Sequence, residues 1–62
     1  MKHLNYYIAI DADAELALNL ILEKIPCFIT WHADEDGENW EVDIRCREED
    51  AAYIESMLAA FV

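Results

Sequence analysis

The sequence has few of the residue types from which small catalytic and phosphate-binding sites are usually built. Its one glycine is Gly37, so no glycine-rich loop can hold a phosphate group. Its only serine is Ser56 and its only threonine is Thr30, and neither lies in a motif that activates a hydroxyl for nucleophilic attack. We therefore do not expect an enzyme.

Cysteine and long apolar runs are also scarce. Cys27 and Cys46 are the only two cysteines, and the residues after Met1 lack the apolar core of a signal peptide. No window approaches the ~20 apolar residues of a membrane span. We expect a full-length cytoplasmic protein whose two thiols are reduced and mostly buried, with a pairing across a hairpin left open.

Basic residues are the last deficit. Four lysines and arginines oppose fourteen aspartates and glutamates, which gives a net charge of -10 at pH 7. This exceeds the charge of ~2–8 that keeps a small domain soluble. Such a charge repels nucleic acids and anionic membranes and attracts cations. We therefore expect a basic protein as the partner.

The apolar content of the chain is sufficient for one folded domain, residues 1–62. Hydrophobic residues make up 56% of the chain, which is typical of a packed globule and not of a disordered acidic tail. A domain of this length buries only roughly 60% of the surface that its unfolded chain exposes. Its stability should therefore be modest.

The first half of the chain predicts a strand followed by a helix. Residues 4–10 alternate between two faces, as in a strand with one buried side. Asp11 or Asp13 then caps a helix. This helix runs to about Ile25, because Pro26 cannot continue it. Its apolar residues form one stripe, the predicted buried face: Ala14, Ala17, Leu18, Ile21 and Ile25.

The second half predicts a hairpin and a second helix. Residues 27–32 and 39–46 form two strands joined by a turn in which Gly37 permits a positive φ. From Glu48 onward, apolar residues recur at helical spacing. The inward residues of the second hairpin strand are Trp40, Val42, Ile44 and Cys46, and those of the second helix are Ala51, Ile54, Met57, Leu58 and Phe61.

The order βαββα predicts an α+β fold. Since a β-helix-β crossover is almost always right-handed, the simplest arrangement places the third strand between the first two, in an antiparallel or mixed sheet with both helices on one face. The order of elements resembles a ferredoxin-like fold that lacks its last strand. This resemblance covers nearly the whole chain and carries no functional motif.

In this fold the charges separate to the two ends of the domain. The exit of the first strand, the start of the first helix and the hairpin turn share one end, the acidic pole. The opposite end holds the four basic residues together with Glu48, Glu49 and Asp50. The acidic pole consists of Asp11, Asp13, Glu15, Asp34, Glu35, Asp36 and Glu38, and the basic residues are Lys2, Lys24, Arg45 and Arg47.

Helix starts and Asp-Gly turns explain part of this acidity, but the turn has more carboxylates than it needs. Two exposed charges ~7 Å apart repel by about 0.6 kcal/mol before screening. Glu41 and Asp43 continue the charges along one strand face at a spacing of ~6.7 Å, as regular as a nucleic-acid backbone. We therefore predict that a basic groove contacts Asp34, Glu35, Asp36, Glu38, Glu41, Asp43, Asp11, Asp13 and Glu15.

Metal binding is not favoured by the sequence. The acidic turn, residues 34–38, faintly resembles an EF-hand but lacks its twelve-residue ligand spacing. A zinc site would need Cys27 and His32 together, and strand parity places them on opposite faces. His3 lies at the far end from His32, and Cys46 does not bring them together. We predict no metal and no cofactor.

Exposed apolar residues support an alternative. Leu16 and Leu20 lie opposite the core stripe of the first helix, and Tyr7 and Phe28 lie on the outer face of the sheet. With the unpaired sheet edges, they would serve a structural or regulatory homodimer whose charge only maintains solubility. An inhibitor or antitoxin of another basic nucleic-acid enzyme is a further alternative.

In length, acidity and lack of a catalytic motif, the chain resembles the small phage-encoded anti-CRISPR proteins, many of which imitate DNA. The resemblance covers the whole chain without a diagnostic motif, so it assigns no residues. It implies an inhibitor in the cytoplasm of the host cell that binds a CRISPR effector complex and blocks target DNA.

Overall fold

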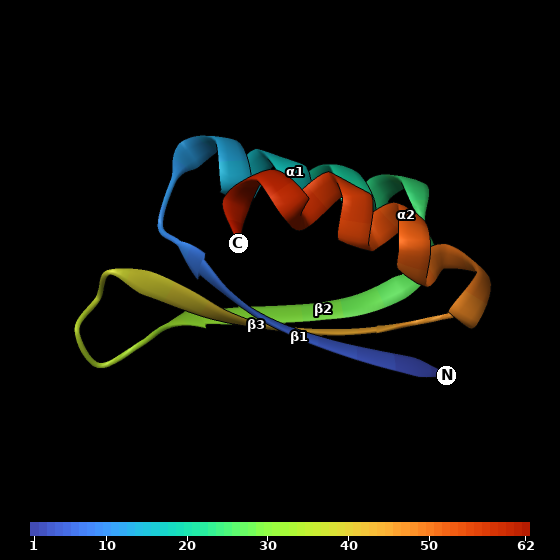
Figure 1. Cartoon of the computed structure of the whole chain (residues 1–62), viewed down its shortest axis with the longest axis horizontal. Helices are drawn as coiled ribbons and strands as arrows, with labels where there is room; N and C mark the ends of the chain where they lie inside the picture. Colours follow the sequence, from blue (N-terminus) through green and yellow to red (C-terminus); the bar gives the residue numbers. More distant parts are fainter.

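The computed structural model describes residues 1–62 and confirms the predicted element order. The elements are β1 (Lys2–Ala9), α1 (Ala12–Lys24), β2 (Cys27–Ala33), β3 (Asn39–Cys46), α2 (Glu48–Leu58) and a short 3₁₀ helix, η1 (Ala59–Phe61). The strands form one antiparallel sheet in the order β1-β3-β2. Both helices cover the same face of the sheet (Figure 1). The α+β fold is therefore the predicted one, with a wholly antiparallel sheet.

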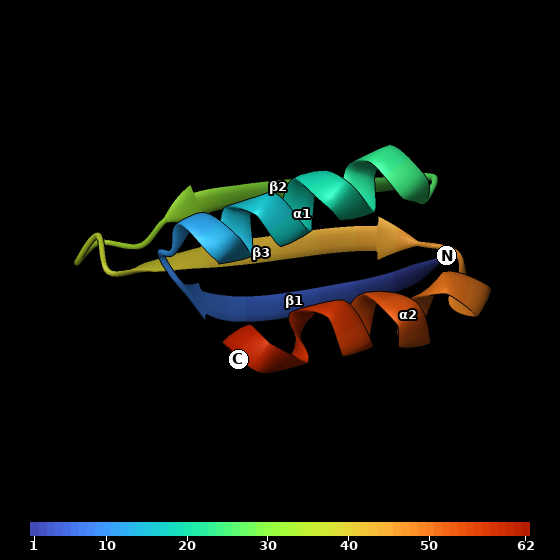
Figure 2. The ribbon, with the colours of Figure 1, turned by 90° about the horizontal axis from the view of Figure 1, so that it is seen from above.

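The two helices lie along the sheet and leave its other face uncovered. Seen from above, α1 runs along β2 and β3, and α2 runs along β1 (Figure 2). Alternation along the strands turns every second side chain away from the helices. We term the uncovered surface the open face; it carries His3, Asn5, Tyr7, Phe28, Thr30, His32, Glu41, Asp43 and Arg45. Neither α1 nor α2 has the length and apolar character that a membrane-spanning helix needs.

Helix α1 begins and ends at local signals in the sequence. Of the two predicted caps, Asp11 is the one used: its backbone is extended and its Oδ1 accepts a hydrogen bond of 2.7 Å from the N–H of Asp13. At the other end, the N–H of Ile25 donates to the carbonyl of Ile21 before Pro26 stops the helix. These contacts fix where α1 starts relative to β1.

The core lies between the sheet and the helices and is entirely apolar. All thirteen buried residues are hydrophobic, and no buried side chain is polar or charged. The predicted α1 stripe is buried throughout, as are Val42, Ile44 and Cys46 of β3. Of the other residues predicted to point inward, Trp40, Met57 and Phe61 are half-buried and pack against this core. Ile10, also expected on the inward side of the first strand, is 43% exposed and lies beyond the end of β1. Tertiary packing therefore follows the predicted periodicity closely.

Candidate partner-binding surface

The acidic pole forms at one end of the molecule, where three segments meet. The exit of β1, the start of α1 and the β2–β3 turn lie together at the left of Figure 1. The N–H of Ile10 donates a hydrogen bond of 3.1 Å to the carbonyl of Glu38, which ties the exit of β1 to the turn. This end holds all seven carboxylates of the acidic pole: Asp11, Asp13, Glu15, Asp34, Glu35, Asp36 and Glu38.

Two of these carboxylates have structural roles. Asp11 caps α1, and the Oδ1 of Asp34 accepts hydrogen bonds from the N–H groups of Glu38 at 3.2 Å and Asn39 at 3.4 Å. Gly37 takes a φ of 70°, which closes the turn. The side chains of the other five are exposed and make no hydrogen bond or ion pair: Asp13, Glu15, Glu35, Asp36 and Glu38.

The basic side chains do not reach the acidic pole. Arg47 is paired at the opposite end, with its Nε 2.8 Å from the Oδ2 of Asp50 and 3.4 Å from the Oε1 of Glu49. The hydrogen bond to Asp50 raises the pKa of Arg47. Lys2, paired with Cys46, and Arg45, paired with His3, lie at that end of the sheet. Lys24 is in the last turn of α1, at the helix end away from Asp11. The negative charge of the pole is therefore not neutralised within the chain.

Glu41 and Asp43 continue the acidic surface from the turn onto the open face. Both lie on β3, the central strand, so residues of β1 and β2 flank them. Tyr7 and His32 are opposite Glu41, and Asn5 and Thr30 are opposite Asp43. The next outward residue of β3 is Arg45, so the predicted row of charges ends after Asp43.

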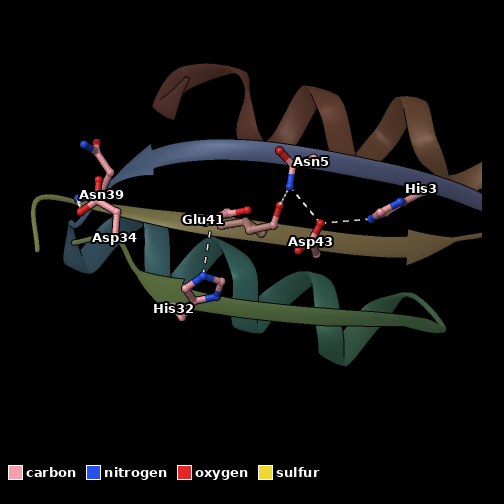
Figure 3. Close-up of polar contacts among 8 residues, drawn as sticks. His3, Asn5, His32, Asp34, Asn39, Glu41 and Asp43 are labelled. Atoms are coloured by element: carbon pink, nitrogen blue, oxygen red, sulfur yellow. Dashed lines mark hydrogen bonds and ion pairs between the residues drawn. The ribbon is translucent and has the colours of Figure 1, made fainter. Parts of the chain in front are cut away.

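The open face also contains contacts that sequence reasoning missed. The Oδ1 of Asp43 accepts a hydrogen bond of 2.9 Å from the Nδ2 of Asn5 and lies 3.1 Å from the Nε2 of His3 (Figure 3). His32 points from β2 toward Glu41, with its Nε2 3.6 Å from the Oε2 (Figure 3). The hydrogen bonds from Asn5 and then His3 lower the pKa of Asp43. Finding these contacts from the sequence would have needed the exact register of the edge strands on β3.

A shallow hollow of about 440 Å³ connects the acidic turn with the open face. Tyr7, which is 59% exposed, and His32 are its aromatic lining residues. Four of its lining residues are acidic and His32 is the only one that can carry a positive charge. Its full lining is Tyr7, His32, Ala33, Asp34, Glu35, Asp36 and Glu41. This composition suits a cationic group from a partner.

The histidine, cysteine and hydroxyl side chains form neither a metal-ligand cluster nor a hydrogen-bonded pair of nucleophile and base. No group of three or more histidine, cysteine, aspartate or glutamate side chains is arranged to hold a metal ion. The hydroxyl of Ser56 donates to the carbonyl of Tyr53 in its own helix. Thr30 is an exposed residue of the open face. Neither hydroxyl is hydrogen-bonded to a side chain that could act as a base.

The four apolar residues named for a dimer lie on two different surfaces of the molecule. Leu16 is 58% exposed on α1, as expected. Leu20 was also expected to face outward, but it is half-buried. Phe28, 70% exposed, and Tyr7 lie on the open face, but on different edge strands and toward opposite ends. The residues named for a dimer are therefore divided between α1 and two separate positions on the open face.

Comparison with known proteins finds no matching family model, no similar curated protein and no similar solved structure. The fold and the surface define the chain as a small α+β domain with one strongly acidic end.

Proposed function

We propose that this protein is an acidic binding module that occupies a basic, nucleic-acid-binding groove of another protein and so excludes the nucleic acid. The observation that carries the proposal is the separation of charge. Seven carboxylates gather at one pole without an ion pair to a basic residue, while the basic residues lie at the other end. The proposed contact surface is the acidic pole together with Glu41 and Asp43.

Electrostatics supports this assignment. The pole carboxylates repel one another at a cost of about 0.6 kcal/mol for each pair ~7 Å apart in water, before screening. Arginine and lysine side chains that hold phosphate would hold carboxylate through the same charge-assisted hydrogen bonds. A complex with a basic groove would therefore relieve the repulsion and gain new contacts, and it would weaken as ionic strength rises.

The hollow beside the turn supports a contact with arginine in particular. A guanidinium in this hollow would lie against the exposed ring of Tyr7. It would also be near the carboxylate of Glu41, which pairs with Tyr7 in the β1–β3 register. Glu41 and Asp43 are two residues apart on one strand face, a spacing of ~6.7 Å. The proposed contact would therefore run from the acidic turn along Glu41 and Asp43 on the open face. It would end at Arg45, the next outward residue of β3.

The target that we propose to test first is a CRISPR effector complex in the cytoplasm of a host cell. The length, acidity and absence of a catalytic motif support this choice. Another basic nucleic-acid enzyme, such as a nuclease, would present a similar groove. For either target, we expect this protein and nucleic acid to compete for the basic groove.

Two charge-matched variants test the proposal. The pole-reversed variant carries Glu35→Lys and Asp36→Lys, and the control-reversed variant carries Glu23→Lys and Glu55→Lys. Each changes the net charge by the same amount. Glu23 is in the last turn of α1, and Glu55 borders the same hollow as Lys2, so both control positions lie away from the acidic pole.

The measurement is displacement of labelled target DNA from the effector complex by increasing amounts of each protein. The unmodified protein and the control-reversed variant should displace DNA, and the pole-reversed variant should need at least tenfold more protein. Equal displacement by both variants would refute the acidic pole as the contact.

A homodimer is the second candidate, favoured by the exposure of Phe28 and Tyr7 on a sheet face that no helix covers. Sedimentation equilibrium at several concentrations separates the two proposals. A monomer throughout would exclude the dimer, whereas a dimer that Phe28→Ser dissociates would favour it.

A further inference from the structure

Cys27 and Cys46 are directly opposite each other in the β2–β3 ladder. Cys27 is the first residue of β2 and Cys46 is the last residue of β3. Residues paired in this way have Cα atoms about 4.5–5.5 Å apart, within the ~4.4–6.8 Å that a disulfide spans. Because paired residues point to the same side of a sheet, the two thiols share the helix-covered face.

The two thiols differ in their exposure to solvent. Cys46 is buried, with 1% of its surface exposed, whereas Cys27 is half-buried and packs at the margin of the core. Both are free thiols in the structure. A reagent in solution would therefore react with Cys27 first. The buried Cys46 would then react with the modified Cys27.

We propose that Cys27 and Cys46 are a site of reversible oxidation that closes into an intramolecular disulfide. The bond would join the α1–β2 junction to the β3–α2 junction and enclose residues 28–45, including the acidic turn. This proposal is independent of the proposed function, because the sulfur atoms lie on the face opposite Glu41 and Asp43.

The oxidant is a low-molecular-weight disulfide, RSSR. The Cys27 thiol loses its proton and its sulfur attacks one sulfur of RSSR, whose S–S bond breaks as RS⁻ leaves and takes up a proton. The Cys46 thiol then loses its proton and attacks the Sγ of Cys27, which breaks the mixed disulfide and releases a second RS⁻. The cysteine pair gives up two electrons and two protons, and RSSR becomes two RSH.

The bond would stabilise the fold mainly by restricting the unfolded chain. A cross-link that closes a loop of this length removes conformational freedom that the reduced chain has when unfolded. Burial raises the pKa of Cys27 and that of Cys46, so exchange proceeds best at mildly alkaline pH. The acidic pole lies at the opposite end of the hairpin and keeps its side chains unchanged.

The test is exchange of the intact, folded protein with oxidised glutathione at mildly alkaline pH, followed by intact mass, free-thiol count and thermal unfolding. We expect a monomer lighter by two hydrogen atoms with no free thiol. Its unfolding temperature should rise by roughly 10 °C or more and return to the original value after reduction by dithiothreitol.

The single variants Cys46→Ala and Cys27→Ala separate the roles of the two thiols. Cys46→Ala should stop at one glutathionyl adduct on Cys27 with no gain in unfolding temperature, and Cys27→Ala should react far more slowly. In the unmodified protein, two glutathionyl adducts, disulfide-linked dimers or two unreacted thiols would each overturn the proposal. These three outcomes are measured on the unmodified protein, so the test does not depend on whether either variant folds well.

Discussion

At the residue scale, the acidic side chains divide into those that hold the fold together and those without a partner in the chain. Asp34 belongs to the first group, because its Oδ1 accepts from two backbone N–H groups of the turn. Asp36 is two residues away in the same turn, and its side chain is exposed and makes no hydrogen bond. Replacing Asp34 and Asp36 in separate variants therefore distinguishes the effect of the hydrogen bonds on stability from the effect of the charge.

We predict that Asp34→Ala lowers the free energy of unfolding by about 1–2 kcal/mol, because two backbone donors lose their acceptor. Asp36→Ala removes the same charge without breaking a hydrogen bond, and it should leave stability unchanged or slightly raise it. Urea unfolding of both variants gives the comparison. Equal losses in the two variants would show that charge, and not the hydrogen bonds, determines the effect.

Asp43 provides a prediction on pH. Its pKa is lowered in the folded protein by hydrogen bonds from Asn5 and His3. The folded state is therefore favoured at pH values above the ordinary aspartate pKa of about 3.9, and this contribution is lost as the pH falls through the lower pKa of the folded state.

Replacing Asn5 by Ala should raise the pKa of Asp43 toward its ordinary value, because the shorter hydrogen bond is lost. The exposed Asn19 on α1 gives the matched control, since Asn19→Ala leaves the open face unchanged. NMR titration of the Asp43 carboxyl carbon measures the change. An unaltered pKa in Asn5→Ala would mean that Asn5 does not stabilise the carboxylate.

At the element scale, hydrophobic periodicity was enough to predict all five elements and most of the core. The stripe of α1 and the alternation of β3 are long and regular, so their buried faces were predicted correctly. The ends of β1 were not, since Lys2 joins the strand by pairing with Cys46 and Ile10 lies beyond it. Such pairings depend on the register with a distant strand, which also explains why the contacts of His3 and His32 were missed.

The packing of α2 on the sheet can be tested with one methyl group. Ile54 is fully buried, whereas the side chain of Ile10 is 43% exposed. Ile54→Val should lower the free energy of unfolding by about 0.5–1.5 kcal/mol, while Ile10→Val should change it by less than about 0.5 kcal/mol. Chemical denaturation measures both. A similar loss at the two positions would contradict the burial of Ile54.

At the scale of the whole molecule, the sequence predicted that acidic and basic residues separate to the two ends of the domain, and the structure places the turn and the start of α1 at one end and Arg47 at the other (Figure 1). What the sequence left open is which pole carboxylates are already used. Only the fold shows that Asp11 caps a helix and Asp34 closes a turn, while Glu35 and Asp36 have no partner in the chain. Within the proposed contact surface, the unpaired carboxylates are the ones that could bind another protein without first giving up a hydrogen bond.

Charge separation also predicts how salt affects stability. Added salt screens repulsion among the pole carboxylates, so the free energy of unfolding should rise by about 1 kcal/mol between low and high ionic strength. The pole-reversed variant, with less repulsion at this end, should show a smaller rise than the control-reversed variant. Urea midpoints across a salt series measure this. The same rise in both variants would place the repulsion elsewhere.

The most direct test of the central claim is affinity capture from a bacterial lysate on columns of the unmodified, pole-reversed and control-reversed proteins. Proteins eluted by a salt gradient are identified by mass and then assayed for competition with DNA. We predict that a basic nucleic-acid-binding protein is retained by the unmodified and control-reversed columns, is lost from the pole-reversed column, and no longer binds DNA in the complex. Equal retention on all three columns, or DNA binding that the complex leaves intact, would contradict the account.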